Sequence, residues 1–129
     1  MNIHWKSFFA GLCSLWLVGC GPAAKDDTIR IAVIPKGTTH EFWQSIHAGA
    51  RKAEKELTAQ GKSVEIIWKG PLKEDDRDQQ MGLVESFTVK GVDGIVLAPL
   101  DAKALVRPVE SAQKSGIPVV IIDSGLETT

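Results

Sequence analysis

The sequence contains only two cysteines, Cys13 and Cys20, and both lie within its first 20 residues. A disulfide framework or a structural zinc site needs more cysteines, distributed through the fold, so neither is expected. An excess of charge is also missing, because 15 basic and 16 acidic residues leave a formal net charge of −1. Without a basic patch, nucleic acid is not an expected partner.

The motifs of several common enzyme classes are also absent. The sequence has no GxGxxG motif for a dinucleotide, no GxxxxGK(S/T) motif for a nucleotide phosphate and no GxSxG motif for a hydrolase nucleophile. His40 and His47 are about two helical turns apart, which is too far for both to bind one metal ion. We therefore expect no enzymatic activity, no cofactor and no metal site.

The first 19 residues have the three parts of a secretory signal: a positively charged start, the short apolar core Ser7–Val18, and small residues after it. The core is too short to cross the roughly 30 Å hydrocarbon layer as a permanent helix. The residues at the end of this core and directly after it, Leu17-Val18-Gly19-Cys20, resemble a bacterial lipobox. In a lipobox, cleavage falls before the cysteine and the cysteine sulfur receives a diacylglycerol. The alternative is a buried helix in which Cys20 is simply a small apolar residue.

We expect residues 1–19 to be a lipoprotein signal peptide that is removed, and residues 20–27 to be the lipidated Cys20 with a flexible tether. Acyl chains hold a protein on a membrane through the burial of their CH₂ groups. The expected location is therefore the cell envelope, either the periplasm or the outer face of the cytoplasmic membrane.

Residues 28–129 alternate between β-branched runs and amphipathic patterns. The runs predict four strands, over Thr28–Ile34, Ser63–Trp68, Gly94–Ala98 and Pro118–Asp123. Three helices are predicted between them from the apolar stripes Ile46/Ala50/Ala53/Leu57, Met81/Val84/Phe87/Thr88 and Ala102/Leu105/Val109/Ala112. Apolar strands separated by amphipathic helices indicate a parallel sheet covered on both faces. With right-handed crossovers, we predict a doubly wound α/β fold, βαβαβαβ, with strand order 2-1-3-4.

In such a sheet the loops after all the strands meet at one edge, and ligands bind where the strand order reverses, here between the first and third strands. The first helix is expected to start with a capping box, because Thr38 stands three residues before Glu41. Phe42 and Trp43 follow in its first turn, where a flat ring can stack on a sugar. Adjacent helical positions diverge by about 100°, so one of these two rings is expected to lie in the core.

Polar candidates lie at the same edge. Asp123 ends an apolar strand, where its carboxylate needs donors, either ligand hydroxyls or the local N–H groups of a turn. For Asp101 the role of a helix N-cap is favoured over ligand binding. His40 either hydrogen-bonds a ligand or is an exposed residue that follows the threonine cap. The charged stretch Lys69–Asp78 is expected to be a solvated face.

Four segments closely resemble the sugar-binding branch of the type I periplasmic binding proteins, which includes the ribose and galactose binders of ABC importers. They are Ile29–Ile34, His40-Glu41-Phe42-Trp43, Gly91–Asp101 and Gly116–Ser124, in the family's order and spacing. The resemblance implies that Phe42 and Trp43 stack on the sugar and that Asp123 accepts hydrogen bonds from its hydroxyls. Thr39, His40, Ser124 and Asp101 are further ligand-binding candidates. The ribose-type pattern has asparagine at positions 40 and 98 and arginine at position 124, where this chain has His40, Ala98 and Ser124.

The family consists of two similar lobes that close over the ligand about a hinge. The resemblance therefore implies that residues 28–129 are the N-terminal lobe, in a fragment or a truncated gene product. The expected function is that of a monomeric, lipid-anchored binding protein that delivers a sugar or polyol to an ABC permease. Two alternatives are a sensory module that reports ligand occupancy to a membrane receptor or kinase, and an α/β enzyme that uses Asp123 or His40. A LacI-type repressor shares the fold, but here a secretion signal stands in place of DNA-binding helices.

Overall fold

The computed structural model describes residues 26–127. The predicted signal peptide and Cys20 lie outside the described residues. The elements are β1 (Ile29–Ile34), α1 (Glu41–Ala59), β2 (Val64–Trp68), α2 (Arg77–Lys90), β3 (Gly94–Leu97), α3 (Val106–Lys114) and β4 (Val119–Ile121). The strands form one parallel sheet with the order β2-β1-β3-β4, so the predicted α/β fold and its strand order 2-1-3-4 are confirmed.

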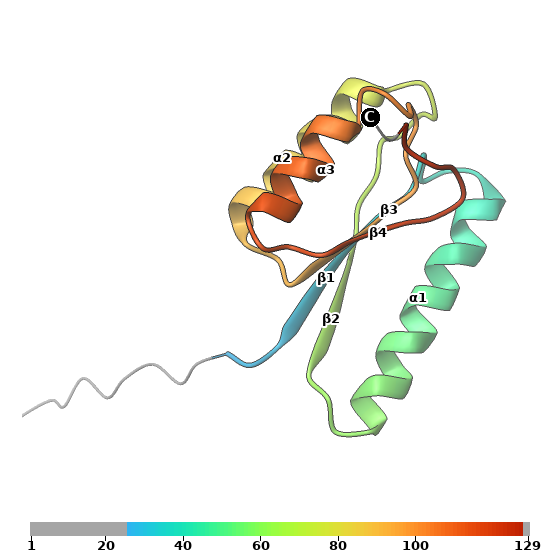
Figure 1. Ribbon diagram of the computed structural model, residues 1–129. Helices are drawn as coiled ribbons and strands as arrows, with labels where there is room; N and C mark the ends of the chain where they lie inside the picture. The colour runs from blue at the N-terminus through green and yellow to red at the C-terminus, as the bar shows by residue number, and fades with distance from the viewer. Residues whose placement is uncertain (1–25, 128–129) are drawn as a thin grey trace, which may run out of the picture.

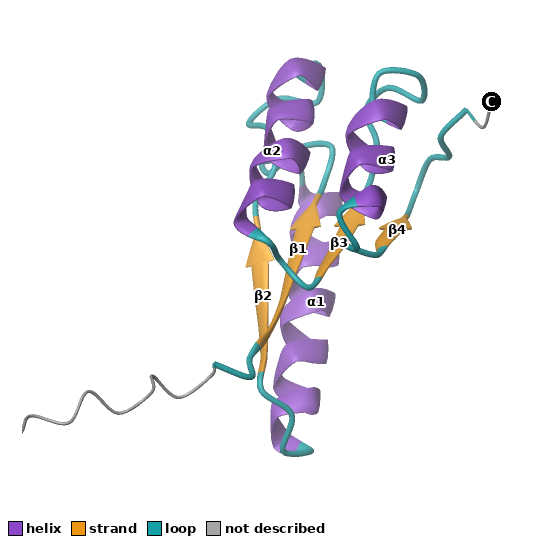
Figure 2. Ribbon diagram, turned by 60° about the vertical axis from the view of Figure 1, so that its left-hand side comes forward, coloured by secondary structure: helices purple, strands orange, loops and turns teal. Residues whose placement is uncertain are grey.

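The helices cover both faces of the sheet. Figure 1 shows α1 on one side and α2 with α3 on the other, and Figure 2 shows all four strands pointing the same way. Within residues 26–127, no helix combines the length and apolar character needed to cross a membrane.

The hydrophobic core lies between the sheet and the pair of helices α2 and α3. Alternate residues of the central strands face it, because successive side chains of a strand point to opposite faces. The predicted stripes of these two helices supply the opposite wall. The core residues include Ala32, Ile34, Val84, Phe87, Ile95, Leu97, Leu105, Val109 and Ala112.

The other face of the sheet is covered less completely, and here the predicted stripe of α1 is partly wrong. Ala53 is exposed, and Glu54 takes the inward position next to it. Its Oε1 accepts the N–H of Ile66 at 2.8 Å, and its Oε2 pairs with Arg51 at 2.6 Å. Because α1 packs against β2, which is an edge strand, a polar side chain can bind a backbone group that has no partner strand.

Two predicted boundaries are also wrong. The third helix begins at Val106, and residues 102–105 form turns instead of its first turn. Pro108 has no N–H and fits an α-helix only in its first turn, which explains the later start. The last strand is only three residues long and ends at Ile121, because the chain turns sharply at Asp123.

Candidate functional site

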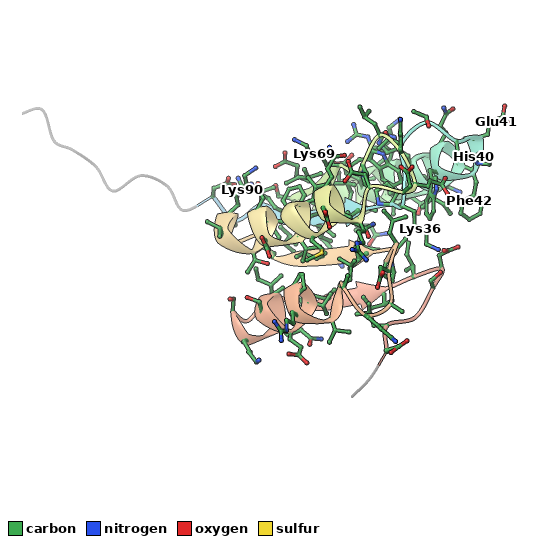
Figure 3. The ribbon with its side chains drawn as sticks, turned by 90° about the horizontal axis from the view of Figure 1, so that it is seen from above. Lys36, His40, Glu41, Phe42, Lys69 and Lys90 are labelled. Carbon is green, nitrogen blue, oxygen red and sulfur yellow. The ribbon has the colours of Figure 1, made fainter. Side chains whose placement is uncertain are left out.

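A pocket of about 270 Å³ lies at the edge of the sheet where the strands end. Its lining comes from the loop after β1, the start of α1, the loop between β2 and α2, and the second residue after β4. The lining residues are Lys36, His40, Phe42, Trp43, Glu74 and Asp123. Figure 3 shows Lys36, His40 and Phe42 together at one end of the molecule, with Lys90 at the other. The loop after β3, which was expected to border the crevice, contributes no lining residue.

The start of α1 differs from the predicted capping box. His40 is the N-cap, with an extended backbone, and its Nδ1 accepts the N–H of Phe42 at 3.2 Å. The Thr38 hydroxyl instead donates to the carbonyl of Pro71 at 3.3 Å. The helix therefore begins two residues later than the predicted capping box requires. The Thr38 hydroxyl instead links the loop after β1 to the loop after β2. The cap holds the His40 imidazole at the wall of the pocket.

Phe42 and Trp43 form an aromatic pair at the pocket. Their ring centroids are 4.9 Å apart and the rings meet edge to face, with an interplanar angle of 79°. Trp43 is 3% exposed and Phe42 49% exposed, which confirms that one of the two rings belongs to the interior. The Nε1 of Trp43 donates to Oε1 of Glu74 at 2.8 Å. The pocket thus has one buried ring, fixed by a hydrogen bond, and one ring that stays accessible.

An ion pair forms the opposite wall of the pocket. Nζ of Lys36 lies 2.7 Å from Oδ2 of Asp123 and also donates to Oγ of Ser124 at 2.6 Å. The hydrogen bond from Lys36 lowers the pKa of Asp123 below its ordinary value, so the carboxylate is charged at neutral pH. Lys36 was not among the residues predicted from the sequence, because one lysine in a loop carries no pattern that distinguishes it from a solvated one.

The backbone turn at Asp123 aims this carboxylate. Asp123 has φ +64°, and the N–H of Ser124 donates to the carbonyl of Ile122 at 2.7 Å, which closes a three-residue turn. A non-glycine residue in this region is uncommon. Asp123 is therefore a turn residue, but its carboxylate does not bind local N–H groups. Its hydrogen-bond partners are Lys36 and the Ser124 hydroxyl.

Asp101 lies outside the pocket. Its Oδ1 accepts the N–H groups of Lys103 and Ala104, each at 2.8 Å, and Oδ2 lies 3.4 Å from the guanidinium of Arg77. The backbone hydrogen bonds, that from Ala104 first, lower the pKa of Asp101. The structure therefore gives Asp101 a local capping role, in the turn that precedes α3.

Two other candidates are also absent from the lining. Thr39 is exposed, and its carbonyl accepts the side chain of Gln44 at 3.3 Å. Ser124 is not among the lining residues of this pocket, but its hydroxyl accepts a hydrogen bond from Lys36, which is. His47, about two helical turns along from His40, stacks on Trp68 with ring centroids 4.5 Å apart. Across residues 26–127, no three His, Cys, Asp or Glu side chains come close enough together to hold a metal ion.

Gln80, a fully buried residue of α2, supports the pocket from below. Its Nε2 donates to the carbonyls of Pro35 at 3.0 Å and Ala98 at 2.9 Å, and its Oε1 accepts the N–H of Leu100 at 2.8 Å. One side chain thus joins the ends of the two central strands and satisfies two buried backbone groups and a partly buried one. No sequence motif marked it.

A larger hollow of about 660 Å³ runs along α3 and the free edge of β4. It is lined by aliphatic residues of α3 and of the segment from β4 onwards, among them Val109, Ile121 and Leu126, and by polar residues of the same two segments, among them Asp123 and Ser124. We place the functional site in the smaller pocket, because there charged and aromatic side chains from separate loops converge, which is the usual character of a ligand site.

Comparisons with known proteins agree on one family. Residues 31–129 match the periplasmic binding protein domain. The D-ribose/D-allose-binding protein of Pseudomonas aeruginosa is 39% identical over 95 residues, which are 74% of this chain and 29% of that protein. The xylitol-binding protein of Mycolicibacterium smegmatis is 33% identical over 122 residues, which are 92% of this chain and 33% of that protein.

Solved structures lead to the same family. A carbohydrate transporter solute-binding protein from Agrobacterium radiobacter, in complex with D-arabinose, matches with a TM-score of 0.72 and 36% identity. The match covers 79% of this chain and 32% of that one. The chain therefore spans about a third of the length of the relatives it matches.

Proposed function

Because this chain belongs to the periplasmic binding protein family, whose matching members are sugar-binding proteins of ABC transporters, we propose that its pocket captures a sugar or polyol for import. The relatives are named for binding, so we also expect no turnover of the ligand. None of them supports the sensory alternative.

The observation that carries the proposal is the Lys36–Asp123 ion pair beside the two aromatic rings. A charged carboxylate is a strong acceptor for ligand hydroxyls. Lys36 has three N–H donors, of which Asp123 and Ser124 take two, so one donor remains for a ligand oxygen. The exposed ring of Phe42 offers an apolar face to the C–H groups of a sugar. Acceptor, donor and apolar face together suit a neutral, hydroxyl-rich molecule.

The pocket is one wall of the proposed site. Its residues lie at the open edge of the sheet, and the chain spans about a third of the length of its relatives. We propose that residues 28–129 are the N-terminal lobe, that a second lobe closes over the ligand, and that the closed monomeric form docks on an ABC permease.

The location of the protein is a second part of the proposal. The family is periplasmic, which agrees with a place in the cell envelope. We propose that the signal peptide is cleaved before Cys20 and that its sulfur carries the lipid. Cys20→Ser should abolish the incorporation of radiolabelled palmitate, with Cys13→Ser as the matched control. Unchanged labelling of Cys20→Ser would contradict the lipid anchor.

Calorimetry on two proteins tests the binding function. The first is this chain, and the second is a chimera in which the C-terminal lobe of the Pseudomonas D-ribose/D-allose-binding protein follows it. Each is titrated with D-ribose, D-allose and xylitol. We expect the chimera to bind at least one of them and the chain alone to bind weakly or not at all. Tight binding by the chain alone would refute the two-lobe account, and a folded chimera that binds none of the three would contradict the proposed ligand class.

A further inference from the structure

Glu74 belongs to a stretch of charged residues, yet it lies against the loop that follows β1. A Cβ atom added to Gly37 would stand 2.8 Å from Cγ of Glu74, so the two segments touch closely. The hydrogen bond from Thr38 to the carbonyl of Pro71 is a second contact between the same loops. Glu74 is exposed, as expected for the solvated stretch Lys69–Asp78, but it also lines the pocket.

Trp43 needs the contact that Glu74 makes. Its indole is 3% exposed, and a buried N–H group that lacks an acceptor is destabilising. Oε1 of Glu74 accepts this N–H at 2.8 Å. Because the acceptor is a carboxylate, the bond is stronger than one between neutral groups. The bond also joins the first turn of α1 to the β2–α2 loop.

The carboxylate of Glu74 is held differently from that of Asp123. Among residues 26–127, the ion pairs within 4.0 Å include Lys36 with Asp123 but none with Glu74. The contacts that place Glu74 are those with Trp43 and Gly37. Glu74 and Trp43 therefore depend on each other for their orientation.

We propose that Glu74 is a positioning residue, which fixes the orientation of the Trp43 indole before any ligand arrives. Phe42 rests edge to face on that indole, so the orientation of the accessible ring follows from the same hydrogen bond. A wall that is already ordered avoids the entropy loss of ordering it on binding. The importance of this wall for a ligand rests on the proposed function, but the orientation itself does not.

The test follows the Trp43 indole N–H in ¹⁵N–¹H spectra of the whole ligand-free chain, with the resonance assigned through Trp43→Phe. Glu74→Ala should shift this resonance and speed its hydrogen exchange roughly tenfold, as expected for the loss of one hydrogen bond. Glu74→Gln keeps an acceptor oxygen and should preserve slow exchange. Asp75→Ala, which removes the adjacent exposed acid, is the matched control and should change nothing.

Gly37→Ala displaces Glu74 without altering it and should reproduce the effect of Glu74→Ala. In the Glu74→Ala background, Gly37→Ala should have no further effect on the indole signal, because the Glu74 side chain that the added Cβ displaces is absent. An indole signal that is unchanged in Glu74→Ala, or lost equally in Glu74→Gln, would overturn the proposal. These readouts need no sugar. If the Trp43 indole responds to the Glu74 variants as expected but the calorimetry detects no sugar binding, only the proposed binding function is contradicted.

Discussion

Asp101 and Asp123 each follow an apolar strand at the same edge of the sheet, but the structure uses them in different ways. Asp101 accepts two backbone N–H groups from the residues directly after it. Asp123 accepts no backbone N–H from the residues after it and pairs instead with Lys36, which follows β1, on the other side of β3. Two aspartates in similar sequence positions therefore have different roles. Asp101 caps the turn that follows it, whereas Asp123 lines a pocket together with residues from distant loops.

The difference comes from the chain that follows each residue. After Asp101 the chain coils towards α3, so successive N–H groups point back at its carboxylate. After Asp123 the chain makes a three-residue turn and stays irregular, so no such group of N–H donors forms. The carboxylate then takes its hydrogen bonds from a side chain that the fold brings near, and it remains beside a pocket where a ligand can reach it.

The largest effect is expected at Gln80, which joins the end of β1, before Lys36, to the end of β3, before Asp101. Gln80→Leu leaves two carbonyls and one N–H without their partner and should lower the free energy of unfolding by about 3 kcal/mol. Urea unfolding followed by circular dichroism measures it. Gln113→Leu, the same change at an exposed position of α3, is the control. A loss below about 1 kcal/mol would mean that the two strand ends do not depend on this side chain.

The next effect separates the two aspartates by ligand binding. In the chimera, Asp123→Ala should weaken sugar binding by about 1.5–3 kcal/mol, or roughly 10- to 150-fold, because charged hydrogen bonds are lost. Asp101→Ala should leave the affinity unchanged. Calorimetry gives both values. Equal losses in the two variants would break the comparison, and unchanged affinity in Asp123→Ala would remove this residue from the site.

A smaller effect separates them by stability. Asp101→Ala removes the acceptor of two backbone N–H groups and should lower the Tm of the chain by several degrees. Asp101→Ser keeps a capping oxygen and should restore most of that loss. Asp123→Ala should change the Tm less, because its ion pair is partly solvated. Differential scanning calorimetry decides this. If Asp123→Ala proved the more destabilising of the two, Asp123 would have to be regarded as structural.

The smallest effect is a pH dependence. Hydrogen bonds lower the pKa of Asp101 in the folded state, so its contribution to stability is complete above the unfolded pKa of about 3.9 and is lost as the pH falls through the folded value. The stability difference between the wild type and Asp101→Ser should therefore be constant above about pH 5 and shrink below about pH 4. Urea midpoints from pH 7 to pH 3 measure it. A difference that grew in acid would contradict the assigned role.

Part of the site could be predicted from sequence. Phe42, Trp43 and Asp123 were placed at the pocket because loops after parallel strands share one edge. Lys36 and Glu74 were missed, although they lie in the same predicted loops. Charged residues in loops are common, and nothing in the neighbouring sequence distinguishes these two, which line the pocket, from the others. The predicted capping box at Thr38 was wrong for a related reason, because the Thr38 hydroxyl donates to the carbonyl of Pro71 in a distant loop.

The features that depend on residues close together in the chain could be predicted from the sequence alone. Apolar periodicity predicted four strands and three helices, and right-handed crossovers favoured the strand order that is observed. The pairings that make the pocket depend on distant segments. Lys36 and Ser124 are 88 residues apart in the chain, and Trp43 and Glu74 are 31 apart. Such contacts form only when the packed sheet brings the loops together, because a hydrogen bond requires two atoms within about 3 Å and no local pattern encodes that distance.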